Sequence, residues 1–90
     1  MSKNPDFIKV AIADDHKIFR DGIKMALSCK ENLKIIWEAE DGKVLIHKIA
    51  IKKPDVLLMD IRMPEIDGIN AIELLRKEYD DVKIIVLSMY

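Results

Sequence analysis

Three short apolar runs of this chain end in side chains that could do chemistry: Asp14-Asp15, Asp60 and Ser88. Three carboxylates that converge would repel one another strongly unless a cation lies between them. Mg²⁺ prefers oxygen ligands, keeps several waters, and suits one or two carboxylates plus a phosphate oxygen. An aspartate beside such a cation can act as a nucleophile toward a phosphoryl group, and the serine hydroxyl can donate a hydrogen bond to a phosphoryl oxygen. The residue types therefore indicate magnesium-dependent phosphoryl chemistry.

The elements that must position these side chains alternate between two kinds of pattern. Apolar or β-rich runs predict four strands, at residues 7–13, 33–39, 56–59 and 82–87. Helical periodicity predicts three helices, at residues 17–29, between the Asp41-Gly42 turn and the break at Lys53-Pro54-Asp55, and at residues 69–79. The apolar face expected for the first helix consists of Ile18, Phe19, Ile23, Ala26 and Leu27.

Strands that alternate with helices of this length predict βαβ units with right-handed crossovers. Continuous apolar strands indicate an open parallel α/β sheet with helices on both faces. Such sheets bind their ligands beyond the carboxyl ends of the strands. If the sheet is parallel, Asp14-Asp15, Asp60 and Ser88 fall on the same rim.

Composition narrows the class of protein. Ninety residues make one small domain, and 15 Lys plus Arg against 16 Asp plus Glu give a formal charge of −1. That balance argues against a dedicated nucleic-acid module, which usually needs a basic excess. The single cysteine, Cys29, excludes an internal disulfide and favours a cytoplasmic setting. We expect no membrane segment and no signal peptide.

From Ile8 to Ser88 the sequence resembles the receiver domain of two-component response regulators, a family with a flavodoxin-like fold. Asp14-Asp15 is similar to the acidic metal-binding pair of that family, and Asp60 resembles its phospho-accepting aspartate. The segment 63–68, Met-Pro-Glu-Ile-Asp-Gly, resembles the loop that follows the acceptor. Asp-Asp-His at the first strand end, with Arg20 and Gly22 in the first helix, resembles the subfamily whose output domain is a helix-turn-helix DNA-binding domain.

The resemblance implies a role for each site residue. Asp60 would accept a phosphoryl group from a sensor histidine kinase, and Ser88 would be the switch hydroxyl. Mg²⁺ would be held by Asp15, Asp60 and the backbone carbonyl of Arg62, with Asp14 in a second shell or bound through water. DNA would be reached only through an output domain that these 90 residues do not contain.

The resemblance also implies differences from a whole receiver domain. The family has a fifth strand carrying a lysine, two further helices and an aromatic switch residue, and the sequence stops at Tyr90, before all of them. We therefore expect residues 1–90 to be a receiver domain truncated after the fourth strand. Its fourth strand would be an uncovered edge, and we expect self-association through it.

Other interpretations remain open on the residues alone. Asp14 or Asp15 could simply cap a helix, and His16 is expected to be a solvated loop or first-turn residue, since Mg²⁺ prefers oxygen. A dehalogenase-like phosphatase also uses a strand-end aspartate, but Arg62 occupies the position where its second carboxylate should be, so we expect no enzyme of that kind. The last alternative is a receiver fragment that does not signal and acts only as a protein–protein assembly module.

Overall fold

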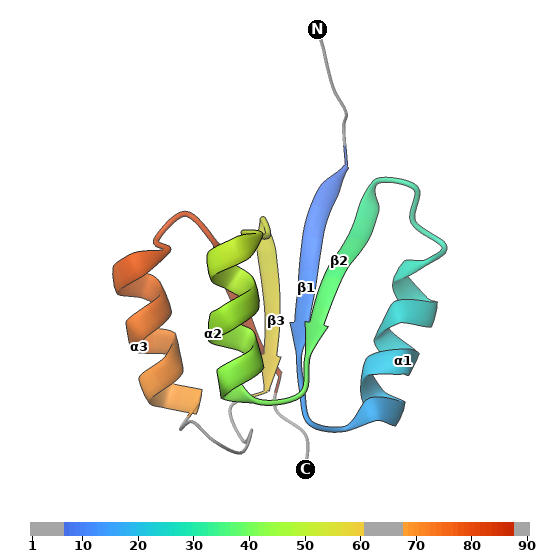
Figure 1. The fold of residues 1–90 in the computed structure, drawn as a ribbon. Coiled ribbons are helices and arrows are strands. Elements are labelled where there is room, and N and C mark those ends of the chain that lie inside the picture. Colours follow the sequence, from blue (N-terminus) through green and yellow to red (C-terminus); the bar gives the residue numbers. More distant parts are fainter. Residues whose placement is uncertain (1–6, 61–67, 88–90) are drawn as a thin grey trace, which may run out of the picture.

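The apolar runs form one parallel sheet with the strand order β2-β1-β3-β4 (Figure 1). The computed structural model describes residues 7–60 and 68–87. Within them the strands are β1 (Ile8–Ala13), β2 (Leu33–Ala39), β3 (Val56–Asp60) and β4 (Lys83–Leu87). Because all four run in the same direction, their carboxyl ends meet at one edge of the sheet, at the bottom of Figure 1. The expected parallel α/β fold is confirmed.

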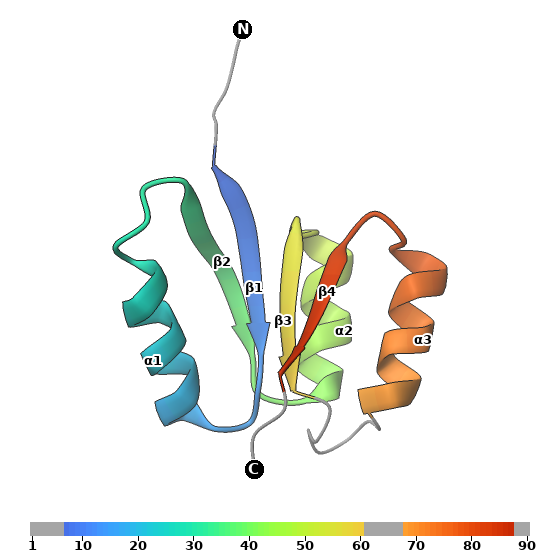
Figure 2. The ribbon, with the colours of Figure 1, turned by 180° about the vertical axis from the view of Figure 1, so that it is seen from behind.

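Three helices cover the sheet: α1 (Lys17–Leu27), α2 (Gly42–Ile51) and α3 (Gly68–Glu78). The chain steps from β1 to β2 in one direction and from β2 to β3 and then β4 in the other. Right-handed crossovers therefore place α1 on one face and both α2 and α3 on the opposite face. The two opposite views show this arrangement (Figures 1 and 2).

The main core lies between the sheet and helices α2 and α3. The fully or nearly fully buried members of this core are Ala11, Ala13, Ala39, Leu45, Ile49, Leu57, Met59, Leu75 and Val82. Strand residues of alternating position supply one side of it, and the apolar stripes of the helices supply the other. The core therefore fixes β1 and β3 side by side, with Ala13 opposite Met59 at their carboxyl ends.

The buried side of helix α1 differs from the apolar face that the sequence predicted. Ile18 and Ala26, both assigned to the apolar face, are exposed (Ile18 by 88%), and no residue of this helix is fully buried. The half-buried residues of this helix are Phe19, Arg20, Asp21, Ile23, Lys24 and Leu27. Ile18 lies about 100° around the helix from Phe19, outside this stripe. Two cations share the inward face with the apolar side chains, a pattern that apolar periodicity alone does not reveal.

The element ends lie within two residues of the predicted ones, a difference typical of fraying termini. The first helix, for example, ends at Leu27 rather than Cys29.

Strand β4 pairs only with β3 and leaves Ile85 and Val86 44% and 43% exposed. The expectation that the fourth strand lies at an edge is confirmed within the described residues. None of the helices there has the length and apolar character needed to cross a membrane.

Candidate functional site

Two carboxylates reach the carboxyl edge of the sheet from neighbouring strands. Asp14 follows the last residue of β1, and Asp60 is the last residue of β3. β1 and β3 are paired up to Ala13 and Met59, so the residues that follow, Asp14 and Asp60, lie side by side. One ligand atom each from Asp14, Asp15, His16 and Asp60 lies within 4.8 Å of every other. The predicted convergence of three carboxylates is therefore confirmed, whereas Arg62 and Ser88 lie outside the described residues.

Asp14 is the most completely buried polar residue of this cluster. Its backbone N–H donates to the carbonyl of Ala39 (2.9 Å), and its Oδ1 accepts from the backbone N–H of His16 (2.7 Å). The residue is 0% exposed, and among the described residues nothing donates a hydrogen bond to its Oδ2. A buried carboxylate oxygen without a donor is unfavourable unless a cation or water binds it. This orphaned oxygen, next to two further carboxylates, fits a hard divalent cation.

Helix capping does not account for the aspartate pair. The N-cap residue of α1 is His16, and no side chain makes a capping hydrogen bond there. By contrast, Asp41 caps α2, where its side chain accepts from the backbone N–H of Val44 (2.9 Å). The capping interpretation therefore describes Asp41 and not Asp14 or Asp15.

His16 belongs to the cluster and is also exposed to solvent at the N-cap of α1, as the sequence predicted. Its Nδ1 lies 3.0 Å from Asp14 Oδ1 and 2.9 Å from Asp15 Oδ1, although the side chain is 64% exposed. The hydrogen bond to Asp14, followed by the charge of Asp15, raises the pKa of the imidazole above its ordinary value. A protonated His16 offsets part of the negative charge.

The sequence and the fold both match known proteins. Residues 10–90 match the family model described as the response regulator receiver domain. The chain belongs to this receiver-domain family. The strand order β2-β1-β3-β4 and the carboxylates at the carboxyl edge agree with that assignment.

The receiver domain is similar to both regulators and isolated receiver domains. It is 38% identical over 87 residues to the transcriptional regulatory protein DegU of Brevibacillus brevis, covering 97% of this chain and 37% of DegU. The non-phosphorylated receiver domain of RcsB from Escherichia coli has a TM-score of 0.89 at 34% identity, over 94% of this chain and 67% of that one. An isolated RcsB receiver domain from Salmonella enterica serovar Typhimurium, in the presence of phosphomimetic BeF₃⁻, gives the same score and identity over 94% and 64%. The chain thus spans about two fifths of DegU.

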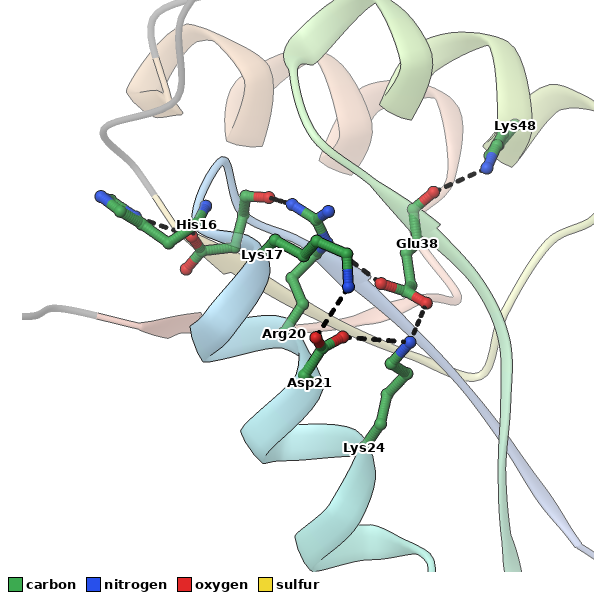
Figure 3. A network of polar contacts seen from close by, with 8 residues as sticks. His16, Lys17, Arg20, Asp21, Lys24, Glu38 and Lys48 are labelled. Atoms are coloured by element: carbon green, nitrogen blue, oxygen red, sulfur yellow. Dashed lines mark hydrogen bonds and ion pairs between the residues drawn. The ribbon is translucent and has the colours of Figure 1, made fainter.

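A second polar network adjoins the carboxylates of the receiver domain (Figure 3). Glu38, on β2, accepts from Arg20 Nε at Oε1 (3.0 Å) and from Lys24 Nζ at Oε2 (2.6 Å). Asp21 lies between Lys24 (3.4 Å) and Lys17 (2.8 Å). The Lys24 hydrogen bond lowers the pKa of the Glu38 carboxyl, and the Arg20 hydrogen bond acts in the same direction.

This network reaches the carboxylate cluster of Asp14, Asp15 and Asp60 through one hydrogen bond. Arg20 Nη1 donates to the backbone carbonyl of Asp14 (2.6 Å). Sequence reasoning noted Arg20 only as part of a family resemblance and did not single out Glu38. The sequence did offer a signal. Arg20 and Lys24 are two cations four residues apart on a predicted helix, and Glu38 is an acidic residue within the β-rich run that follows it.

Proposed function

We propose that this receiver domain accepts a phosphoryl group on Asp60 in a Mg²⁺-dependent reaction, with a sensor histidine kinase as the donor. The observation that carries the proposal is the meeting of Asp14, Asp15 and Asp60 at one edge of the sheet, with the buried Asp14 Oδ2 lacking a donor among the described residues. Relatives named as transcriptional regulators, and a receiver structure with a phosphomimetic, support the same function. A kinase partner of this kind implies a cytoplasmic location.

Each residue has a defined part in this proposal. Asp15 and Asp60 would hold Mg²⁺ with the Arg62 backbone carbonyl, and the orphaned oxygen of Asp14 would face the ion directly or through one water. The bound ion would neutralise charge on the transferring oxygens. The Asp60 carboxylate would attack phosphorus, and the donor would leave with the electrons of its former bond to phosphorus. Ser88 would donate a hydrogen bond to the resulting acyl phosphate.

Control of transcription is a further part of the proposal. DNA would be reached through an output domain outside residues 1–90, and residues 1–90 would belong to the receiver domain. The runner-up function is a receiver unit that does not signal and serves only in assembly.

Intact mass spectrometry tests the phosphorylation proposal. We expect the chain to gain one phosphoryl group when incubated with Mg²⁺ and a small-molecule phosphodonor, and to gain none when EDTA replaces Mg²⁺. Asp60→Ala is the control and should remain unmodified, since it lacks the nucleophile. Absence of an adduct on a folded parent chain would reject the proposal in favour of the assembly function.

We also propose that strand β4 mediates self-association of this 90-residue chain. Its outer edge has no strand partner among the described residues, and Ile85 and Val86 are exposed beside it. Exposed apolar edge strands template pairing with another chain, and a charge placed there opposes it. We expect sedimentation velocity to show a dimer or larger species whose proportion rises with concentration and falls in Val86→Lys. A parent chain that stays monomeric at high concentration would contradict the proposal.

A further inference from the structure

The Arg20 side chain bonds both to the main chain of the carboxylate cluster and to Glu38. Its Nη1 donates to the carbonyl oxygen of Asp14 (2.6 Å), and its Nε donates to Glu38 Oε1 (3.0 Å). The side chain is only 13% exposed, against 38% for Lys24. A guanidinium presents its donors in a fixed planar fork, so the two acceptors together determine its position. Figure 3 shows the Arg20 side chain extending from α1 toward Glu38.

The position of Glu38, which accepts a hydrogen bond from Arg20, is itself fixed by its neighbours. It lies in β2 opposite Ile12 of β1, so the sheet fixes its backbone next to the strand that leads to Asp14. Its carboxylate is held from α1 by Arg20 and Lys24, and its backbone carbonyl accepts from Lys48 Nζ of α2 (2.7 Å). Elements on both faces of the sheet therefore hold the residue that orients Arg20.

The Arg20 bond completes the restraint of Asp14. The backbone N–H, the backbone carbonyl and Oδ1 of Asp14 bond to Ala39, Arg20 and His16 respectively. With these three points fixed, the direction of Oδ2 is fixed as well. Partners that orient a metal-binding carboxylate in this way typically contribute about 10–100-fold to metal affinity.

We propose that Arg20 is a positioning residue for the Mg²⁺ site: it holds the Asp14 main chain so that Asp14 Oδ2 faces the ion. The inference rests on the proposed function, because it assumes that Mg²⁺ binds among Asp14, Asp15 and Asp60. Arg20 is a cation, and a purely electrostatic role would predict that its removal tightens Mg²⁺ binding. Positioning predicts the opposite sign, so the direction of the change separates the two roles.

Calorimetric titration of the 90-residue chain with MgCl₂ tests the proposal. Arg20→Met should weaken Mg²⁺ binding by about tenfold or more. Lys24→Met is the matched control: it also removes a cation from Glu38, but Lys24 makes no bond to Asp14 among those described. We expect Lys24→Met to bind Mg²⁺ within about twofold of the parent chain, because the Asp14 restraints remain.

A conservative variant and a folding measurement keep the test decisive. Arg20→Lys retains the charge but can satisfy only one of the two acceptors, so we expect partial rescue, to about threefold weaker binding than the parent. Urea unfolding in EDTA shows whether each variant is folded before titration. If Arg20→Met does not fold, Arg20→Lys carries the test, and parent-like affinity in it overturns the proposal.

Three results would overturn the inference or its basis, and they are distinguishable. Unchanged or tighter binding in folded Arg20→Met would reject positioning while leaving the Mg²⁺ site intact. Equal weakening in Arg20→Met and Lys24→Met would assign the effect to the Glu38 charge balance instead. A parent chain that binds no Mg²⁺ would reject the proposed metal site itself, and the inference with it.

Discussion

Asp14→Asn is expected to abolish measurable Mg²⁺ binding and at the same time to stabilise the metal-free chain. The amide keeps an acceptor for the His16 N–H, which now bonds to Asp14 Oδ1 at 2.7 Å. It replaces the orphaned, fully buried Oδ2 with a neutral donor near the carboxylates of Asp15 and Asp60. Removing one negative charge from this cluster relieves repulsion. Affinity for Mg²⁺ should fall by more than about 100-fold, since a direct or water-bridged ligand is lost rather than a supporting partner.

The gain in metal-free stability has a measurable size. A buried polar atom left without a partner costs about 1–3 kcal/mol, so we expect the free energy of unfolding in EDTA to rise by about that amount. Urea denaturation with and without Mg²⁺ measures both effects. Asp15→Asn is the matched control: its side chain is 31% exposed, so the gain in EDTA should be smaller. An Asp14→Asn chain that is less stable in EDTA than the parent would contradict this account.

Leu45→Ala is expected to give the largest loss of stability among the variants considered. Leu45 lies in α2 and is fully buried in the core that fixes β1 against β3. Truncating such a leucine typically costs about 2–5 kcal/mol, because transfer free energy is lost and a cavity remains. Domains of this size are stable by only about 5–15 kcal/mol in total. We therefore expect a large fall in the urea midpoint.

Ile51→Ala provides the comparison within the same helix. Ile51 is 72% exposed at the end of α2, so its truncation should change the free energy of unfolding by no more than about 0.5 kcal/mol. Equal losses in the two variants would mean that α2 does not pack against the sheet as described. Mg²⁺ affinity, measured on the folded fraction, should be unchanged in both, because neither side chain belongs to the carboxylate cluster proposed to hold the ion.

Local patterns were sufficient to predict most of the architecture. Continuous apolar strands can be buried only in a sheet covered on both faces, and helix-period segments between them require right-handed crossovers. Asp14 and Asp60 could be assigned to the same edge because the carboxyl ends of parallel strands meet there. These inferences depend on periodicity and chain direction, both of which are properties of the sequence.

Two features of helix α1 needed the tertiary structure. The inward position of Arg20 depends on β2 carrying Glu38 beside β1, and its hydrogen bond to Glu38 joins residues 18 positions apart in the chain. Ile18 was assigned to the wrong face because apolar character was used as the guide, whereas the contact stripe of α1 also contains charged residues. Long side chains can bury their stems while their charged ends find partners, so burial does not follow hydrophobicity alone.

The sequence by itself determined the fold class, the edge of the sheet where the chemistry lies and the carboxylates Asp14, Asp15 and Asp60, because residue type and element order carry that information. Only the tertiary structure decided that Asp14 Oδ2 is buried without a donor among the described residues, that His16 joins the carboxylates, and that Arg20 holds the Asp14 carbonyl. The physical reason is that hydrogen-bond satisfaction depends on distances and directions between elements, which packing sets and residue spacing does not.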